Sequence, residues 1–202
     1  MKTARNNPEL RKLGIKLKTK EEINLWEVIE SPEKYVKSER DVIKIKSIEE
    51  IIKKTLEHKA NEVKSVTSSK DAFALLQKFY VTNKLNRRKE HFVVMYLSHS
   101  NEPKKIELIT TGGWAHTQIE PKEIFKHALE ICATNIILCH NHPANTSEEL
   151  LRPSTGDKEV TSLIYKICRL MNMSLLDHLI LSHDYTTYYS FTDSGVIEEI
   201  KF

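Results

Sequence analysis

The chain has 202 residues, of which 40% are hydrophobic and 29% are charged, with a formal net charge of +3. This length suits one compact domain with an appendage, since domains cluster near ~100–150 residues. The stretch 1–20 lacks the apolar centre of a signal peptide, and no apolar run approaches the ~18 residues that span a membrane. Three cysteines without a CxxC pair argue against a disulfide framework, so we expect a reduced, cytoplasmic protein without a membrane partner.

Positive charge concentrates in the N-terminal third. Residues 1–70 hold 17 Lys or Arg against 12 Asp or Glu, so the remainder carries a net −2. Such a segment can contact nucleic acid or an acidic partner, but a solvated helical surface has the same composition. Apolar residues recur at helical spacing between Lys20 and Leu56, whereas Ile43–Lys46 alternates like a short strand and 58–67 is typical of a connector. We expect a basic, partly helical extension over 1–66.

Strand and helix patterns alternate through the rest of the chain. The expected order is a helix capped by Ser68, strands Phe92–Leu97 and Ile106–Thr110, a helix from Pro121 to about Thr134, a strand Ile136–Cys139, a helix from Ser154, and strands Leu175–Leu181 and Tyr188–Phe191. Leu129 and Cys132 would face the core from the second helix, and Leu163 and Leu170 from the third. Helices between strands predict an α/β sandwich.

Candidate metal ligands follow the strand Ile136–Cys139. His140 and His142 are two residues apart, so both side chains point to one side of an extended chain, and imidazole nitrogens suit Zn²⁺. A catalytic zinc needs a third protein ligand, which Asp157 can supply from the first turn of the next helix, where a carboxylate is favoured. Water on such a metal has its pKa lowered towards ~7. Cys139 should face the opposite side and pack in the core.

Two further residues fit the same chemistry. Glu90, at the start of the strand that contains Phe92, is a candidate general base that takes a proton from water. Ser154 is a candidate hydrogen-bond donor to the oxyanion that forms on an attacked carbonyl.

Each of these residues also has an ordinary structural interpretation. Ser154 and Asp157 have the spacing of a helix capping box, and the two histidines could be loop residues bonded to the backbone. Glu90 follows three basic residues and could form a surface ion pair. His-Asn-His also occurs in ββ-metal nucleases, but the wider context of that motif is missing. Local spacing alone leaves these alternatives open.

Several stretches, in order, resemble the RadC family, a bacterial branch of the JAB/MPN metalloenzymes. The matching stretches are Glu90-His91-Phe92-Val93-Val94, Pro121-Lys122-Glu123-Ile124-Phe125, Ile136-Ile137-Leu138-Cys139-His140-Asn141-His142-Pro143, Pro153-Ser154-Thr155-Gly156-Asp157, Leu175-Leu176-Asp177-His178-Leu179-Ile180 and Tyr189-Ser190-Phe191. The resemblance covers about two thirds of the chain, and we assign residues 67–202 to a RadC-like JAB/MPN domain.

The resemblance implies a three-layer α/β sandwich like that of the cytidine deaminases, with a zinc site of the JAMM type. Its ligands would be His140, His142 and Asp157, with Glu90 as general base and Ser154 as oxyanion donor. The implied activity is zinc-dependent hydrolysis of the peptidase or isopeptidase class, on a protein or peptide. No Pro-Cys-x-x-Cys element is present, which argues against a deaminase. The alternative is a non-catalytic zinc module associated with DNA or with another protein, and the family name points to DNA repair.

The chain departs from the family pattern in two places. Fourteen residues separate His142 from Asp157, where about ten are usual, and we expect the additional residues around 147–151 to bulge outwards. Glu148 or Glu149 is then a rival ligand. The N-terminal third also lacks the helix-hairpin-helix region of many relatives. Finally, Asp177-His178 either orients a ligand histidine or caps a strand edge.

Overall fold

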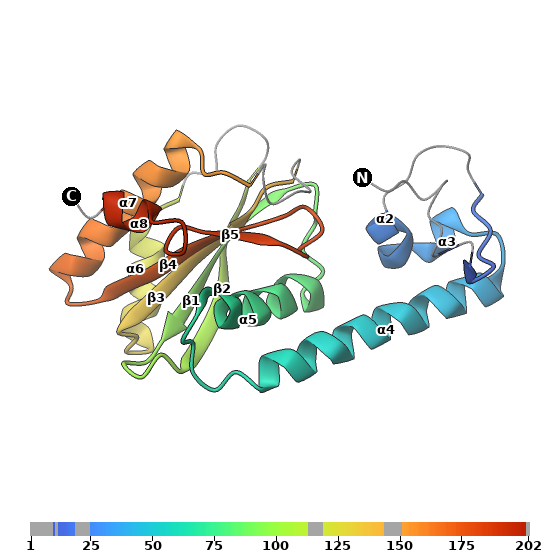
Figure 1. Cartoon of the computed structure of the whole chain (residues 1–202), viewed down its shortest axis with the longest axis horizontal. Helices are drawn as coiled ribbons and strands as arrows, with labels where there is room; N and C mark the ends of the chain where they lie inside the picture. The colour runs from blue at the N-terminus through green and yellow to red at the C-terminus, as the bar shows by residue number, and fades with distance from the viewer. Residues whose placement is uncertain (1–9, 11, 19–24, 113–118, 144–150, 201–202) are drawn as a thin grey trace. The chain divides into compact units, whose positions relative to one another are not determined.

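The computed structural model describes residues 10, 12–18, 25–112, 119–143 and 151–200 (Figure 1). The chain divides into two compact units, residues 1–57 and 58–202. The domain boundary expected at 66/67 stays a prediction. No helix among the described residues is long and apolar enough to cross a membrane.

The N-terminal unit is helical. It contains α2 (Leu25–Glu30), α3 (Pro32–Tyr35) and most of α4 (Glu39–Asn61). The strand predicted at Ile43–Lys46 is wrong, because this stretch lies inside α4, and the connector predicted from 58 begins only after that helix ends at Asn61. Ile45 is fully buried while Ile43 is 65% exposed, as expected for helical positions two residues apart. The core of this unit comprises Leu10, Ile15, Val28, Ile29, Val36 and Ile45.

The opposite exposures of Ile43 and Ile45 yield a matched pair of substitutions. Ile45→Ala should cost about 2–4 kcal/mol of the free energy of unfolding, because it leaves a cavity in the core. Ile43→Ala should change it by no more than about 0.5 kcal/mol. Urea unfolding of the full chain, followed by the fluorescence of Trp26, which packs against this core, measures both. Equal losses would contradict the helical assignment.

The C-terminal unit is built on a five-stranded sheet in the order β2-β1-β3-β4-β5. The strands are β1 (Glu90–Leu97), β2 (Pro103–Gly112), β3 (Asn135–Asn141), β4 (Ser174–Leu181) and β5 (Tyr188–Ser190). The central pair, β3 and β4, is parallel, and the other neighbours are antiparallel. Each element predicted after Ser68 is present, with ends shifted by a few residues.

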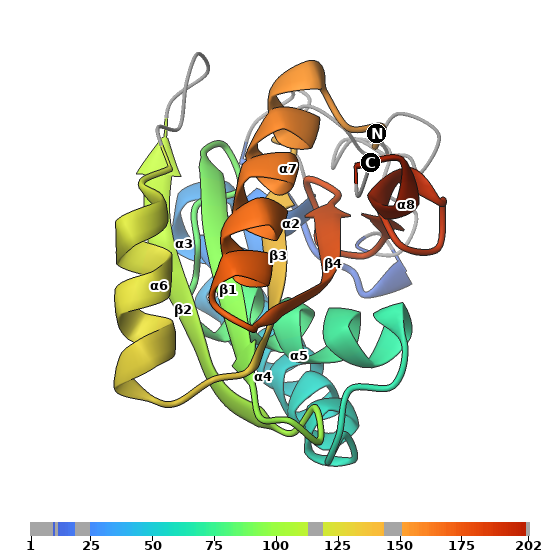
Figure 2. The same ribbon diagram turned by 90° about the vertical axis from the view of Figure 1, so that its left-hand side faces the viewer.

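Helices cover both faces of this sheet. α5 (Ser69–Thr82) packs on one face, and α6 (Pro121–Glu130) and α7 (Thr155–Leu170) pack on the other, as Figure 2 shows. The short α8 (Val196–Ile200) adds Val196 and Ile197 to the core on the α6 and α7 side. Alternation along β3 divides the two cores: Ile136 and Leu138 face α7, whereas Ile137 and Cys139 face α5. The three-layer α/β sandwich and the packing role of Cys139 are therefore confirmed.

The buried faces of α6 and α7 are narrower than the apolar faces predicted for them. Leu129 is 63% exposed, Leu163 48% and Leu170 85%, and Cys132 lies beyond the end of α6 in exposed chain. A helix in an outer layer buries only the narrow stripe that touches the sheet, which in α7 is Thr161, Ile164 and Cys168. In the opposite sense, Leu151 was expected in an outward bulge but is fully buried in the core.

Candidate metal centre

The two histidines lie at the carboxyl end of β3. Every residue of this strand is buried, because β1 and β4 flank it and helices cover both of its faces. His140 is 1% exposed and shares the α7 face with Leu138. The main-chain N–H of His142 donates to the carbonyl of Leu181 at 3.0 Å, so the strand pairing continues one step past Asn141. The side chain of His142 therefore returns to the same side as that of His140.

Asp157 reaches this point from α7, the crossover helix between the parallel strands β3 and β4. Crossover helices begin at the carboxyl edge of a parallel sheet, the usual position of ligand sites in α/β folds. The helix starts with a capping box: Ser154 Oγ accepts from the N–H of Asp157 (3.2 Å), and Asp157 Oδ2 accepts from the N–H of Ser154 (2.7 Å). This cap fixes the Asp157 carboxylate in the first turn, above β3.

The side chains of His140, His142 and Asp157, here called the metal-ligand group, converge. The two Nε2 atoms are 3.0 Å apart, Asp157 Oδ1 lies 3.2 Å from Nε2 of His140, and Asp157 Oδ2 lies 3.7 Å from Nε2 of His142. In tetrahedral zinc with bonds of ~2.0–2.1 Å, neighbouring donors lie roughly 3.3 Å apart. The group therefore fits this ion in both donor type and spacing. Within the described part of the chain, no other set of three such residues converges this closely.

The carboxylate of Asp157 has two functions at once. Oδ2 serves the helix cap and also accepts from Ser154 Oγ at 2.7 Å, while Oδ1 faces His140. Burial raises the pKa of Asp157, but hydrogen bonds to His140, His142 and Ser154 outweigh it and hold the pKa well below its usual range. The side chain is therefore ionised, as a metal ligand must be. The capping-box interpretation and the ligand interpretation are compatible, because the cap occupies Oδ2 and leaves Oδ1 directed at Nε2 of His140.

Glu90 is the first residue of β1. Phe92 is paired with His140 across β1 and β3, and Glu90 shares the face of Phe92 because it is two residues away. Its side chain is thus on the side of the sheet that carries the metal-ligand group, and it is half-buried. Ser154 donates its hydroxyl proton to Asp157 here. The roles of Glu90 as base and Ser154 as oxyanion donor stay predictions.

Asn141, between the two histidines, was not singled out from the sequence. It is fully buried and faces away from the metal-ligand group. Its Oδ1 accepts from the N–H of His91 and its Nδ2 donates to the carbonyl of Lys89, both at 2.9 Å. These two main-chain groups flank Glu90, so the amide clamps the backbone on both sides of the candidate base. An amide side chain is suited to this clamp because it donates and accepts at once.

Loss of the Asn141 clamp should be measurable without any substrate. Asn141→Ala removes the partner of the buried N–H of His91 and of the partly buried carbonyl of Lys89, and should cost about 2 kcal/mol of the free energy of unfolding. Asn83→Ala is the control, because its amide donates to a helix carbonyl at an exposed position, and it should cost about 0.5 kcal/mol. Urea unfolding of both variants tests this, and equal costs would sink the clamp interpretation.

His178, on β4, lies directly behind His140. Its Nε2 is 2.8 Å from Nδ1 of His140, and its Nδ1 is 2.7 Å from the hydroxyl of Thr161 on α7. It is 1% exposed, and its ring stacks on that of Phe191 at 4.7 Å. Burial, with a further contribution from His140, holds the pKa of His178 well below its usual value. His178 thus contacts a candidate ligand, as expected if it orients a ligand histidine. Thr161 was missed, although a polar residue on an otherwise apolar helix face was an available signal.

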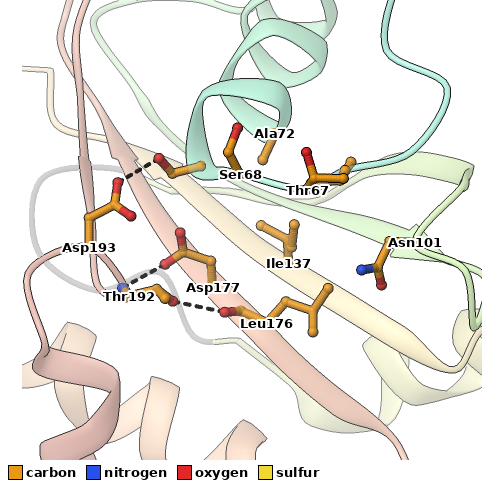
Figure 3. Close-up of a pocket in the computed structure, with 11 residues that line it drawn as sticks. Thr67, Ser68, Ala72, Asn101, Ile137, Leu176, Asp177, Thr192 and Asp193 are labelled. Atoms are coloured by element: carbon orange, nitrogen blue, oxygen red, sulfur yellow. Dashed lines mark hydrogen bonds between the residues drawn. The ribbon is translucent and has the colours of Figure 1, made fainter.

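Asp177 has the structural role that was its alternative. It faces α5, where it lines a pocket of about 270 Å³ on the side of the sheet opposite the metal-ligand group (Figure 3). Its carboxylate accepts from Ser190 Oγ (2.6 Å) and from the main-chain N–H of Thr192 (3.0 Å). Burial raises its pKa although these bonds lower it. Because Asp177 accepts hydrogen bonds from the residues on both sides of Phe191, it fixes the ring that stacks on His178.

The loop between the histidines and Asp157 falls largely outside the described residues. Residues 144–150 include Glu148 and Glu149, so the rival-ligand hypothesis lies there as well. The chain resumes with Leu151, which is buried in the core beside α7.

A helix-covered mixed sheet with two histidines and an aspartate at its carboxyl edge defines a domain of the JAB type. A model of the RadC-like JAB domain matches residues 66–196, and the chain belongs to that family. It is 38% identical over 135 residues to a UPF0758 protein of Flavobacterium johnsoniae, which covers 67% of this chain and 55% of the relative. It is 33% and 31% identical over 147 residues to UPF0758 proteins of Pelodictyon phaeoclathratiforme and Chlorobium chlorochromatii, with 72% of this chain and 61% of each relative covered. The chain thus spans between about half and two thirds of these curated relatives.

Proposed function

We propose that this chain is a zinc-dependent hydrolase of the peptidase or isopeptidase class. The observation that carries the proposal is the convergence of two imidazole nitrogens and one ionised carboxylate at the carboxyl edge of the sheet. Three protein ligands leave one position of a tetrahedral zinc for water or substrate, which is the pattern of catalytic rather than structural sites. Membership of the RadC-like JAB domain family supports the same conclusion.

The proposed reaction assigns a role to each residue. His140, His142 and Asp157 would hold the ion, which when bound would supply Lewis acidity and lower the pKa of water. Glu90 takes a proton from the attacking water and returns it to the leaving amine, so that a C–O bond forms and the C–N bond breaks. The hydroxyl of Ser154 turns from Asp157 towards the oxyanion as negative charge develops there. Asn141 keeps Glu90 in register with the histidines through its bonds to Lys89 and His91.

The ligand assignment is tested by metal analysis. We expect about one zinc per chain in the purified protein and its loss in His140→Ala and Asp157→Ala, because either change leaves too few donors. His99→Ala removes an exposed histidine on the turn after β1 and should keep the zinc. Zinc retained in both ligand variants would show that the assignment is wrong.

The assignment of Glu90 is tested by separating metal binding from turnover. Glu90→Gln should keep the zinc and lower hydrolysis by about 10²–10⁴-fold, since it removes only the proton acceptor. The probe is a library of internally quenched peptides, assayed with the zinc-loaded protein. Glu102→Gln, at an exposed turn, is the control and should leave the rate unchanged. Equal rates in Glu90→Gln and the wild type would exclude Glu90 as the base.

A non-catalytic module that contacts DNA or another protein is the second proposal, and the excess of basic residues in 1–70 supports it. DNA binding that persists after the zinc is removed, and that weakens when the lysines and arginines of this segment are changed, would support the non-catalytic proposal.

We also propose a cytoplasmic location, because the three cysteine thiols form no disulfide.

A further inference from the structure

We infer that Thr161 and His178 act as positioning residues that keep the side-chain proton of His140 on Nδ1. The inferred chain of hydrogen bonds runs from the carbonyl of Asp157 through Thr161 and His178 to His140, and we call it the tautomer relay. It leaves Nε2 of His140 as the atom that presents a lone pair to the metal-ligand group. The importance of the relay for metal binding rests on the proposed function, but its proton positions do not.

The first step is the direction of the Thr161 hydroxyl. Thr161 Oγ1 lies 2.5 Å from the main-chain oxygen of Asp157 and 2.7 Å from Nδ1 of His178. A carbonyl oxygen can only accept, and a hydroxyl has one proton, so that proton is directed to Asp157. The oxygen of Thr161 must then accept from His178. This places a proton on Nδ1 of His178.

The second step concerns the other nitrogen of His178. The ring is enclosed by Phe191, stacked at 4.7 Å, and by Phe92, edge-on at 5.8 Å, and in the described part of the chain its two nitrogens bond to His140 and Thr161 and to no carboxylate. A second proton would place a charge on a fully buried ring whose hydrogen-bond partners among the described residues are another imidazole and a hydroxyl, which is strongly unfavourable. Nε2 of His178 therefore carries a lone pair, and the contact at 2.8 Å requires a proton on Nδ1 of His140. This holds whether His140 is neutral or charged, because Nδ1 carries a proton in both forms.

The consequence falls on the opposite side of the His140 ring. Its Nε2 is the atom 3.2 Å from Asp157 Oδ1 and 3.0 Å from Nε2 of His142. The tautomer of a metal-binding histidine is set by the hydrogen bond that its other nitrogen makes. A residue of α7 therefore acts on the metal-ligand group twice: Asp157 supplies a ligand through its side chain, and its main-chain carbonyl sets the orientation of the relay.

The direct test is the protonation pattern in the metal-free protein. Two-bond ¹H–¹⁵N correlation spectra of histidine-labelled protein distinguish protonated from bare ring nitrogens, and His140→Gln and His178→Gln assign the signals. We expect protonated Nδ1 and bare Nε2 on His178, and protonated Nδ1 on His140. A bare Nδ1 on His140 in the wild type overturns the inference, without any need for a further variant to fold.

Thr161→Val and Thr161→Ser supply the matched comparison. The valine removes the acceptor with little change of shape, so the Nδ1 proton of His140 should be lost from a fraction of the molecules and the zinc dissociation constant should rise about 10–100-fold. The serine restores the hydroxyl and should restore both readouts. Thr82→Val is the control, because Thr82 makes the same bond to the carbonyl four residues before it, on α5, and it should change neither. Unaltered spectra and zinc affinity in Thr161→Val would contradict the relay.

The outcomes separate this inference from the proposed function. If the tautomers are as expected but no peptide is cleaved, the relay stands and the catalytic proposal fails. If the tautomers differ while Glu90→Gln abolishes hydrolysis and His140→Ala loses zinc, the catalytic proposal stands and the relay fails.

Discussion

The candidate metal centre depends on the complete burial of β3. A strand with neighbours on both edges and helices on both faces has no access to water, so each polar atom that it carries needs a partner within the protein. Most of its residues are apolar and meet this condition through packing. The polar side chains are Asn135, which bonds to Ser98 and Asn101 at the start of the strand, and His140 and Asn141 at its end, whose partners define the site. One face of the strand therefore holds the metal-ligand group, and the other holds the clamp on the candidate base.

In this arrangement, the same hydrogen bonds stabilise the fold and set the geometry of the site. The amide of Asn141 bonds to the carbonyl of Lys89, just before β1, and to the N–H of His91 within β1, and in doing so it fixes Glu90 relative to the histidines. The carboxylate of Asp157 caps α7 with one oxygen and faces His140 with the other. Capping is normally worth only about 1 kcal/mol. In this chain the cap matters chiefly for position, because it holds a partly buried carboxylate at the place where two imidazoles meet.

The parts of this structure that the sequence predicts are those set by local rules. The Ser68 cap with Asp71, the buried strand that starts near Phe92, and the convergence of histidines at i and i+2 each depend on neighbours in the chain. The alternation at Ile43–Lys46 failed because four residues fit either period, and the flanking helical pattern was the better guide. The contact between Thr161 and His178 escaped prediction for a different reason. They lie 17 residues apart, and only the packing of α7 against β4 brings them together.

The pair Asp177-His178 on β4 connects the pocket beside α5 with the metal-ligand group on the other face of the sheet. Successive residues of a strand point to opposite faces, so the aspartate reaches the pocket beneath α5 while the histidine reaches the metal-ligand group. Asp177 holds Ser190 and Thr192, and Phe191 between them stacks on His178. The carboxylate of Asp177 thus holds Phe191 in the position that excludes water from the ring of His178. Without water, a second proton on that ring is unfavourable. The two residues therefore act together across the sheet. The structural role of Asp177, which holds Phe191 in place, is the physical basis for the role of His178 beside the candidate ligand His140.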